Sequence, residues 1–161
     1  MDPNRKFTYV EMKFFTMWWD EQTDYMKDQV RQLVKEHRLE FVNAGWSMTD
    51  EAAAHYDDML NNMIIGHEFL KKEFDYVPTI GWHVDPFGHS NANPRLFADM
   101  GFEAWWFARA DYEDFEQRTT DKSLQFVWRP FYESLGNTVE IFTNMFYGTY
   151  YWPAYFNVDE R

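Results

Sequence analysis

Short segments of strand type alternate along this chain with longer segments whose apolar residues recur at helical spacing. Strands that alternate with helices of this length are typical of βαβ units, in which the strands pair in parallel and helices cover the sheet. The sequence therefore predicts an α/β fold with a largely parallel sheet flanked by helices, as a single domain over residues 1–161. The predicted strands are Phe7–Met12, Leu39–Asn43, Pro78–Val84 and Glu103–Phe107, with further strands at Leu124–Arg129 and Thr138–Thr143.

Three helices are predicted between the first four strands. The first lies within residues 26–37, where apolar side chains recur every three or four positions. The second starts at Thr49, a natural N-cap that is followed by two acidic residues. The third opens at Asn93-Pro94, with proline at its first position, and is closed by Gly101. The face of the second helix that we expect to be buried consists of Ala53, Tyr56, Leu60, Met63, Ile64, His67 and Leu70.

Charge and composition exclude several classes of partner. The chain has 15 Lys and Arg against 27 Asp and Glu, a net charge of −12. Such a chain repels nucleic acid and anionic membrane surfaces, so neither is expected as a partner. No apolar run approaches the ~20 residues needed to span a bilayer, and residues 1–6 lack a segment of signal-peptide type. Without cysteine, neither a disulfide nor a thiolate metal site is possible. These features suggest a cytosolic protein or a segment of a larger one.

Aromatic residues are abundant, with 16 Phe, 10 Tyr and 8 Trp. Aromatic rings fill cores efficiently, and on a surface they offer flat faces to sugar rings. We expect core or interface positions for most of them, including Trp18, Trp19, Trp105 and Trp106. Trp46, which follows Gly45 in a loop, is the one tryptophan that we consider as lining of an active site.

Three loops are expected at the carboxyl edge of the predicted sheet, where parallel α/β proteins bind ligands. They are Ala44–Trp46, Asp85–Ser90 and Arg109–Tyr112. In the middle loop, His83, Asp85 and His89 bring three possible metal ligands into seven residues.

A carboxylate such as Asp85 could be a nucleophile, a general base, a metal ligand or a helix cap, since Asp before proline is common in turns. Arg109 follows the next predicted strand and could pair with Asp85 and keep it ionised, or form a structural ion pair at the sheet edge. His55 and His67 lie on a predicted apolar face and are expected to be satisfied core residues.

The segment Trp82–Ser90, WHVDPFGHS, resembles the signature of the class II α-mannosidases, glycoside hydrolase family 38, in its lysosomal-like branch. The resemblance covers the whole chain but only the first part of the family's seven-stranded α/β catalytic domain. Outside the signature, the agreement extends through Glu11, Phe14-Phe15, Trp18-Trp19, Gln22, Leu39–Phe41, Gly45-Trp46, Met48, Asp50-Glu51, His55-Tyr56, Leu96-Phe97, Met100–Phe102, Arg109 and Asp111-Tyr112.

This resemblance implies hydrolysis of terminal α-mannosides in glycoprotein glycans, with retention of configuration. Asp85 would be both the nucleophile and a zinc ligand, with a second carboxyl group about 5–5.5 Å away as acid/base. Phe87 would lie close to the bound mannose, and Arg109 would hydrogen-bond near the nucleophile. Tyr150 resembles the family's sugar-contacting tyrosine, followed here by Trp152-Pro153. The implied partner is a mannose-containing oligosaccharide, in the lysosome or secretory pathway.

The chain also departs from the family pattern. The other zinc ligands, a His-x-Asp pair before this segment and a His after it, are absent, so one ligand of four is present. The acid/base Asp is also expected to lie beyond the chain. We therefore expect the chain alone to be inactive and to need the missing remainder of the catalytic domain. The alternatives are a fragment that only binds a sugar or a protein, and a carbohydrate deacetylase with an Asp/His metal site. We do not assign His83 to zinc, and we expect His89 to support the site. Tyr151 stands where the family usually carries Asp or a smaller polar residue.

Overall fold

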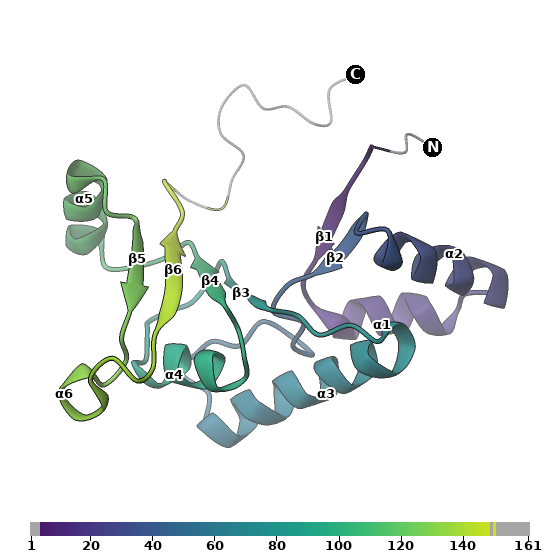
Figure 1. Cartoon of the computed structure of the whole chain (residues 1–161), viewed down its shortest axis with the longest axis horizontal. Helices are drawn as coiled ribbons and strands as arrows, with labels where there is room; N and C mark the ends of the chain where they lie inside the picture. The colour runs from purple at the N-terminus through teal and green to yellow at the C-terminus, as the bar shows by residue number, and fades with distance from the viewer. Residues whose placement is uncertain (1–3, 149, 151–161) are drawn as a thin grey trace.

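The computed structural model describes residues 4–148 and 150, whose strands form two sheets (Figure 1). In the smaller sheet, β1 (Phe7–Tyr9) and β2 (Leu39–Phe41) pair in parallel. In the larger sheet, β3 and β4 pair in parallel, β4 and β6 do the same, and β5 is antiparallel to β6. The prediction of an α/β fold with largely parallel strands is confirmed. The strands of the larger sheet, in spatial order, are β3 (Ile80–His83), β4 (Ala104–Phe107), β6 (Ile141–Met145) and β5 (Gln125–Trp128).

Asn43 joins the two sheets. Its backbone amide donates to Ile80 O at 2.6 Å, and its Oδ1 accepts from Trp82 N at 3.3 Å. Asn43 and Ala44 both have positive φ, 57° and 56°, a conformation that asparagine tolerates better than most residues. The chain therefore leaves the β geometry directly after β2, and one fully buried side chain replaces the regular ladder between β2 and β3.

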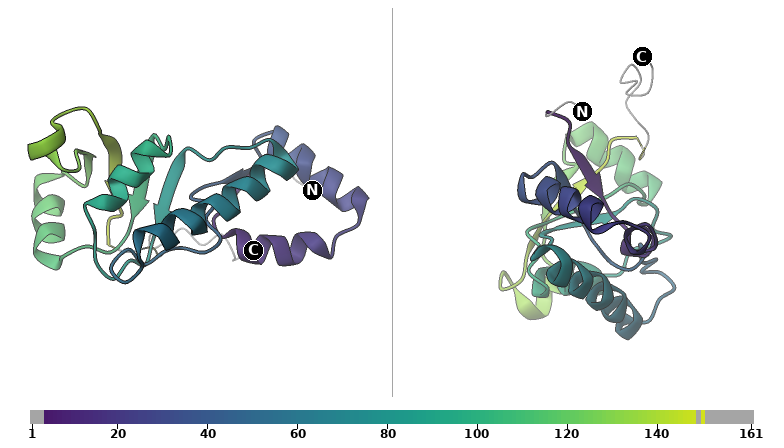
Figure 2. Two further views of the ribbon diagram at one scale, coloured as in Figure 1. Left: turned by 90° about the horizontal axis from the view of Figure 1, so that it is seen from below. Right: turned by 90° about the vertical axis from the view of Figure 1, so that its right-hand side faces the viewer.

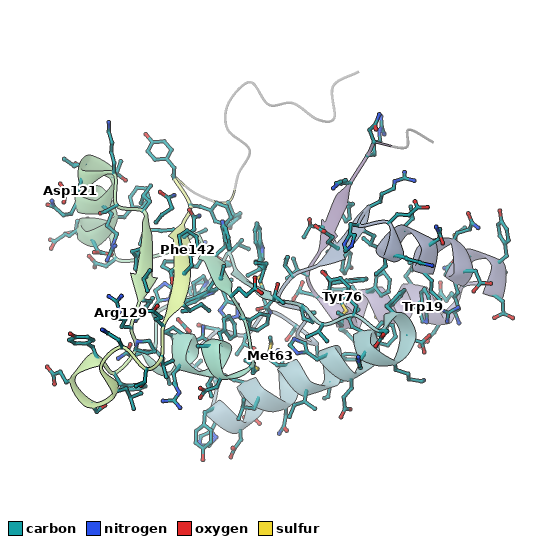
Figure 3. All side chains as sticks on the ribbon, viewed as in Figure 1. Trp19, Met63, Tyr76, Asp121, Arg129 and Phe142 are labelled. Atoms are coloured by element: carbon teal, nitrogen blue, oxygen red, sulfur yellow. The ribbon has the colours of Figure 1, made fainter. Side chains whose placement is uncertain are left out.

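Helices pack along these sheets (Figures 1 and 2). The longest, α3, runs beneath both sheets: its Leu70 belongs to the N-terminal core cluster and its Met63 to the C-terminal one. Figure 3 shows Met63 near the middle of the molecule, between Trp19 and Tyr76 on one side and Phe142 on the other. The helices are α1 (Met12–Asp20), α2 (Asp24–Lys35), α3 (Tyr56–Phe74), α4 (Ala92–Asp99), α5 (Tyr112–Asp121) and α6 (Tyr132–Leu135).

The predicted first strand is too long, because helix α1 begins at Met12. The amides of Met12 and Lys13 donate to the carbonyls of Gly45 and Trp46, at 3.0 and 2.9 Å, so the loop after β2 satisfies donors that the first helical turn leaves unpaired. The helix buries one face at helical spacing. That face consists of Met12, Phe15, Thr16 and Trp19.

The predicted start of α3 at Thr49 is also wrong. Helix α3 begins at Tyr56, and the Nδ1 of His55 caps it by accepting from Asp57 N at 3.3 Å. His55 is thus exposed, against our expectation of a core residue. Met63 and Leu70 are buried as predicted, whereas Tyr56 and Ile64 are exposed. Met59 and Gly66 complete the buried face.

Other predicted elements need smaller corrections. Helix α4 starts at Ala92, so Pro94 is its third residue rather than its first, and Gly101 follows its end with φ 88° as expected. Helix α5 was not predicted. The prediction that Trp19 and Trp105 are core residues is confirmed, but Trp18 is 41% exposed. No helix in the described part of the chain is long and apolar enough to cross a membrane. That residues 1–161 form a single domain stays a prediction.

Candidate active site

Asp85 and Arg109 meet at the carboxyl edge of the larger sheet. Strands β3 and β4 are parallel neighbours in which His83 is paired with Phe107, and each charged residue lies two positions beyond its strand's member of that pair. The Nε of Arg109 donates to Oδ1 of Asp85. The predicted contact is therefore present in the structure. The pKa of Arg109 is raised by its hydrogen bonds to Asp85 and Tyr150.

Two aromatic rings lie close to the Arg109 guanidinium. Its central carbon lies 5.4 Å from the centre of the Phe87 ring and 5.9 Å from that of Tyr150, distances typical of cation–π contacts. The Phe87 ring is 71% exposed and the Tyr150 residue 40%. Phe87, Arg109, Tyr112 and Tyr150 are among the residues that line an open hollow of about 810 Å³. The structure therefore brings together Asp85, Phe87, Arg109 and Tyr150.

A second hollow, of about 240 Å³, also borders the loop that carries Asp85 and shares Pro86 and Phe87 with the first. Asp85 lines it together with Glu11 and Asp50. Both of these carboxylates already accept backbone amides: Glu11 Oε1 from Met48 N at 3.0 Å, and Asp50 Oδ1 from Phe87 N at 3.2 Å. The Asp85 side chain is 40% exposed, and it does not cap the following helix α4, whose N-cap is Asn91. The carboxylate is therefore accessible from solvent.

The loop after β2 packs tightly against the loop of Asp85. Asp50 Oδ1 accepts from both Ala52 N and Phe87 N. Gly88, with φ 145°, lies so close that a Cβ built on it would be 3.1 Å from the Cβ of Ala52. Our assignment of Asp50 and Glu51 to a helix start is therefore wrong, because these residues hold the loop of Asp85 instead.

The buried Glu51 and the partly buried His89 form a pair that contacts the backbone of Arg109. Oε1 of Glu51 lies 2.6 Å from His89 Nδ1, and His89 Nε2 lies 2.6 Å from the carbonyl oxygen of Arg109. Burial raises the pKa of Glu51, although the hydrogen bond from His89 opposes the shift. Burial alone would lower the pKa of His89, but the hydrogen bonds to Glu51 and the Arg109 carbonyl outweigh it and raise that pKa. The expectation that His89 supports the site agrees with these contacts. No pattern in the sequence indicated that Glu51 is its partner.

His83 is buried, and it is among the residues that line the same hollow as Asp85. It is 2% exposed, and neither ring nitrogen has a hydrogen-bond partner among the described residues. Burial lowers its pKa to about 4, so the ring is neutral at pH 7. With Asn93, whose amide is likewise unpaired within the described chain, it lines an internal space of about 10 Å³, which is close to the volume that one water molecule needs.

Trp46 does not join the other candidates. Its ring packs against the N-terminal core cluster, its amide donates to Asn62 O at 2.9 Å, and Lys13 Nζ lies 5.4 Å from its ring centre. It is not among the residues lining either hollow beside Asp85. His67, in contrast, is satisfied as expected, with Nε2 donating to Asn43 O at 2.9 Å.

The described residues do not form a zinc site by themselves. They contain no group of three or more His, Cys, Asp or Glu placed to hold a metal ion. Of the three possible ligands in the signature, His83 is buried, His89 is held between Glu51 and Arg109, and Asp85 is accessible from solvent. The predicted features at Tyr151 and Trp152-Pro153 lie outside the described residues.

Comparisons with known proteins agree on one family. Residues 1–161 match the family described as "Glycosyl hydrolases family 38 N-terminal domain". The chain is 48% identical over 161 residues to an α-mannosidase of Canavalia ensiformis, covering 99% of this chain and 16% of that protein. It is 44% identical over 146 residues to the lysosomal α-mannosidase of Homo sapiens, covering 89% of this chain and 14% of that protein. The chain thus spans about one sixth of the length of these relatives.

Solved structures show the same fold. An α-mannosidase from Enterococcus faecalis V583 superposes with a TM-score of 0.67 at 18% identity, covering 90% of this chain and 16% of that one. A 4-α-glucanotransferase from Thermococcus litoralis superposes with a TM-score of 0.65, also at 18% identity, covering 89% of this chain and 21% of that one.

Proposed function

The chain belongs to glycosyl hydrolase family 38, and on that premise we propose that it is the nucleophile-bearing part of a retaining α-mannosidase, with Asp85 as the nucleophile. One observation carries the proposal. Asp85 is a solvent-accessible carboxylate at the carboxyl edge of parallel strands. It is held by Arg109, it lines one hollow, and its loop also lines a second. The glycan substrate and the lysosomal or secretory location are proposed from the relatives.

The geometry supports distinct roles for the two Asp85 oxygens. Oδ1 accepts from Arg109 Nε, while Oδ2 makes no hydrogen bond with the described residues. In the proposed first step, Oδ2 forms a bond to the anomeric carbon as the bond to the leaving oxygen breaks, and an acid donates a proton to that oxygen. Water then cleaves the mannosyl–Asp85 ester, and the same acid, now a base, takes its proton. Arg109 stabilises the carboxylate before attack and after release.

Aromatic surface beside Asp85 supports sugar binding. The exposed Phe87 ring offers a face to the apolar side of a mannose ring, and the Tyr150 ring also lies near the Arg109 guanidinium. These two residues and Arg109 are proposed as substrate-binding. That Trp46 lines the active site stays a prediction. The geometry does not support it, because the ring packs against the N-terminal core cluster.

Two parts of the reaction are proposed to come from outside this chain. The acid/base carboxyl is one, since Glu11 and Asp50 are already engaged with backbone amides. The other is the rest of the zinc site, in which Asp85 would be one ligand of four. Zinc in such a site orients the sugar hydroxyls next to the anomeric centre.

The main alternative is a fragment that binds a sugar or a protein and catalyses nothing. It is favoured by the lack of a metal-binding group among the described residues. We expect the isolated chain to hold no stoichiometric zinc in equilibrium dialysis, because a single carboxylate binds zinc weakly. We also expect it to leave an aryl α-mannoside intact. One tightly bound zinc per chain would contradict the proposed division of the ligands.

The decisive test restores the missing parts. In the Canavalia ensiformis relative, the matching 161 residues are replaced by this chain, and hydrolysis of an aryl α-mannoside is measured. We expect turnover, and we expect Asp85→Ala to lower it at least about 10⁴-fold, as losses of covalent nucleophiles do. Azide added to the Asp85→Ala protein should restore activity and yield the β-mannosyl azide, since azide then attacks the face that Asp85 would have used. Ordinary turnover by Asp85→Ala refutes the assignment. Acetate release from an acetylated sugar, without cleavage of the aryl α-mannoside, would instead indicate a deacetylase.

A further inference from the structure

Glu51 is a buried carboxylate that the proposed chemistry does not use. It lies in the loop between β2 and α3, and its side chain is 0% exposed. A buried carboxylate is costly unless it is paired and hydrogen-bonded. Here the partner is His89, at 2.6 Å from Oε1, in the loop that carries Asp85. The pair therefore ties together two loops that lie 38 residues apart in the sequence.

His89 continues the chain of contacts to a third loop. Its Nε2 lies 2.6 Å from the carbonyl oxygen of Arg109. A carbonyl oxygen can only accept, so Nε2 carries a proton, and the remaining proton of the pair lies between Nδ1 and Glu51. The ring is held in this plane by aromatic neighbours, with centroids at 4.4 Å for Phe107 and 5.8 Å for Trp105. The imidazole thus has one orientation in which both nitrogens are satisfied.

The backbone that His89 holds belongs to the residue that contacts Asp85. Arg109 lies beyond the end of β4, where no ladder partner fixes its carbonyl. We propose that Glu51 is a positioning residue of the Asp85 site: its buried carboxylate, acting through His89, fixes the Arg109 backbone so that the guanidinium reaches Asp85. This inference rests on the proposed function for its catalytic consequence, but the contact chain can be tested without catalysis.

The neighbouring residue holds the other side of the same site. Asp50 Oδ1 accepts from Phe87 N, two residues after Asp85. Two consecutive acidic residues thus fix both the loop of Asp85 and the start of the loop of Arg109. Asp50 and His83 are the other titratable groups that act on the Glu51–His89 pair or respond to it.

The protonation of the pair supplies a measurable signature. Burial raises the pKa of Glu51, and contacts with Glu51 and the Arg109 carbonyl raise that of His89 against the effect of burial. The two groups lie 2.6 Å apart, so their protonation is coupled and they titrate as a pair. In Glu51→Gln, the amide keeps the shape and can donate to Nδ1, but the charge that holds a proton on Nδ1 is gone.

The first experiment records the ¹⁵N signals of the His89 ring against pH in the 161-residue chain, assigned with His89→Gln. We expect His89 to be doubly protonated above its ordinary range in the wild type. In Glu51→Gln the ring should become neutral, with its proton on Nε2. Its affinity for a second proton should fall at least tenfold. Glu73→Gln is the matched control, because Glu73 is also largely buried but pairs with Arg31 near the smaller sheet. Identical His89 titration in wild type and Glu51→Gln would overturn the proposal.

The second readout follows the Arg109 Nε–H signal, which reports the contact with Asp85. The chemical shift of this signal in Asp85→Ala defines the value expected for a broken contact. We expect Glu51→Ala to move the wild-type signal at least halfway to that value, and Glu73→Gln to leave it in place. If Glu51→Ala does not fold, as judged by circular dichroism, His89→Gln replaces it. An Arg109 signal that stays at its wild-type position in a folded variant refutes the positioning role.

The third readout is activity in the hybrid with the Canavalia ensiformis relative. Glu51→Gln should lower kcat about tenfold and change KM less than about threefold, because Arg109 and Asp85 must be aligned in the reacting complex. An unchanged kcat would show that the contact has no catalytic consequence and would overturn that part of the inference. A wild-type hybrid without mannosidase activity would instead count against the proposed function, and the two spectroscopic readouts would still decide whether Glu51 positions Arg109.

Discussion

Replacing Asn43 by alanine tests whether one side chain joins the two sheets. The change removes the acceptor of Trp82 N, which is partly buried, and an unsatisfied buried amide costs about 1–3 kcal/mol. It also places alanine at φ 57°, a left-handed conformation that costs roughly 1–2 kcal/mol for a residue with a Cβ. Asparagine tolerates this conformation better, so we expect Asn43→Ala to lower the free energy of unfolding by about 2–4 kcal/mol.

Urea unfolding followed by tryptophan fluorescence measures this loss. Asn43→Gly separates the two contributions, because glycine adopts positive φ without strain, and it should lose about 1 kcal/mol less than Asn43→Ala. The control is Asn61→Ala on the exposed side of α3, which should stay within about 0.5 kcal/mol of wild type. An Asn43→Ala protein as stable as that control would refute the claim that Asn43 connects the sheets.

Three further outcomes are expected. Gly66→Ala should lower the free energy of unfolding by about 2–3 kcal/mol despite the better helix propensity of alanine, since a Cβ at Gly66 would lie 1.9 Å from Ala44 O. A variant as stable as wild type would mean that α3 does not pack closely against the loop of Ala44. Between pH 6.5 and about 4, His83 takes up a proton in the unfolded chain but not in the folded one. The free energy of unfolding should therefore fall by about 3 kcal/mol as the pH is lowered through this window. His83→Gln should remove that part of the pH dependence, and an unchanged profile would argue against a buried neutral ring. Phe87→Ala should alter stability by less than about 0.5 kcal/mol because the ring is largely exposed, yet raise KM for an aryl α-mannoside in the hybrid; an unchanged KM would remove Phe87 from the sugar site.

The contact between Asp85 and Arg109 could be predicted because it follows from local order. Parallel neighbouring strands end at one edge, and each residue lies just beyond a strand that the sequence pattern indicates. Helix α1 was not predicted, although Met12, Phe15 and Trp19 recur at helical spacing. The aromatic and β-branched residues before it favoured a longer strand. The strand stops at Tyr9, and the helix starts where the amides of Met12 and Lys13 donate to the carbonyls of Gly45 and Trp46. These carbonyls lie more than 30 residues further along the chain, so local sequence does not reveal the boundary.

The pair of Glu51 and His89 could not be predicted in the same way. Thr49 followed by two acidic residues has the form of a helix start, but the chain continues through a loop, and His55 caps α3 instead. Whether Glu51 is exposed or buried depends on the loop of Asp85 closing over it, which is a tertiary event. Helix α5 buries none of its residues, so no apolar period marked it. Its local signals were Asp111, which caps it by accepting from Glu113 N and Asp114 N, and the charged residues of its first and last turns.

The equal spacing of Asp85 and Arg109 from the paired residues His83 and Phe107 constrains chain length as well as residue identity. Side chains alternate between the two faces of a strand. One residue added or deleted between His83 and Asp85, or between Phe107 and Arg109, would therefore turn Asp85 or Arg109 away from its partner. In contrast, residues 113–122 could gain or lose residues without moving either partner. Natural variants or engineered insertions should therefore accumulate in α5 and the loop after it. They should avoid the single residues, Val84 and Ala108, that separate Asp85 from His83 and Arg109 from Phe107.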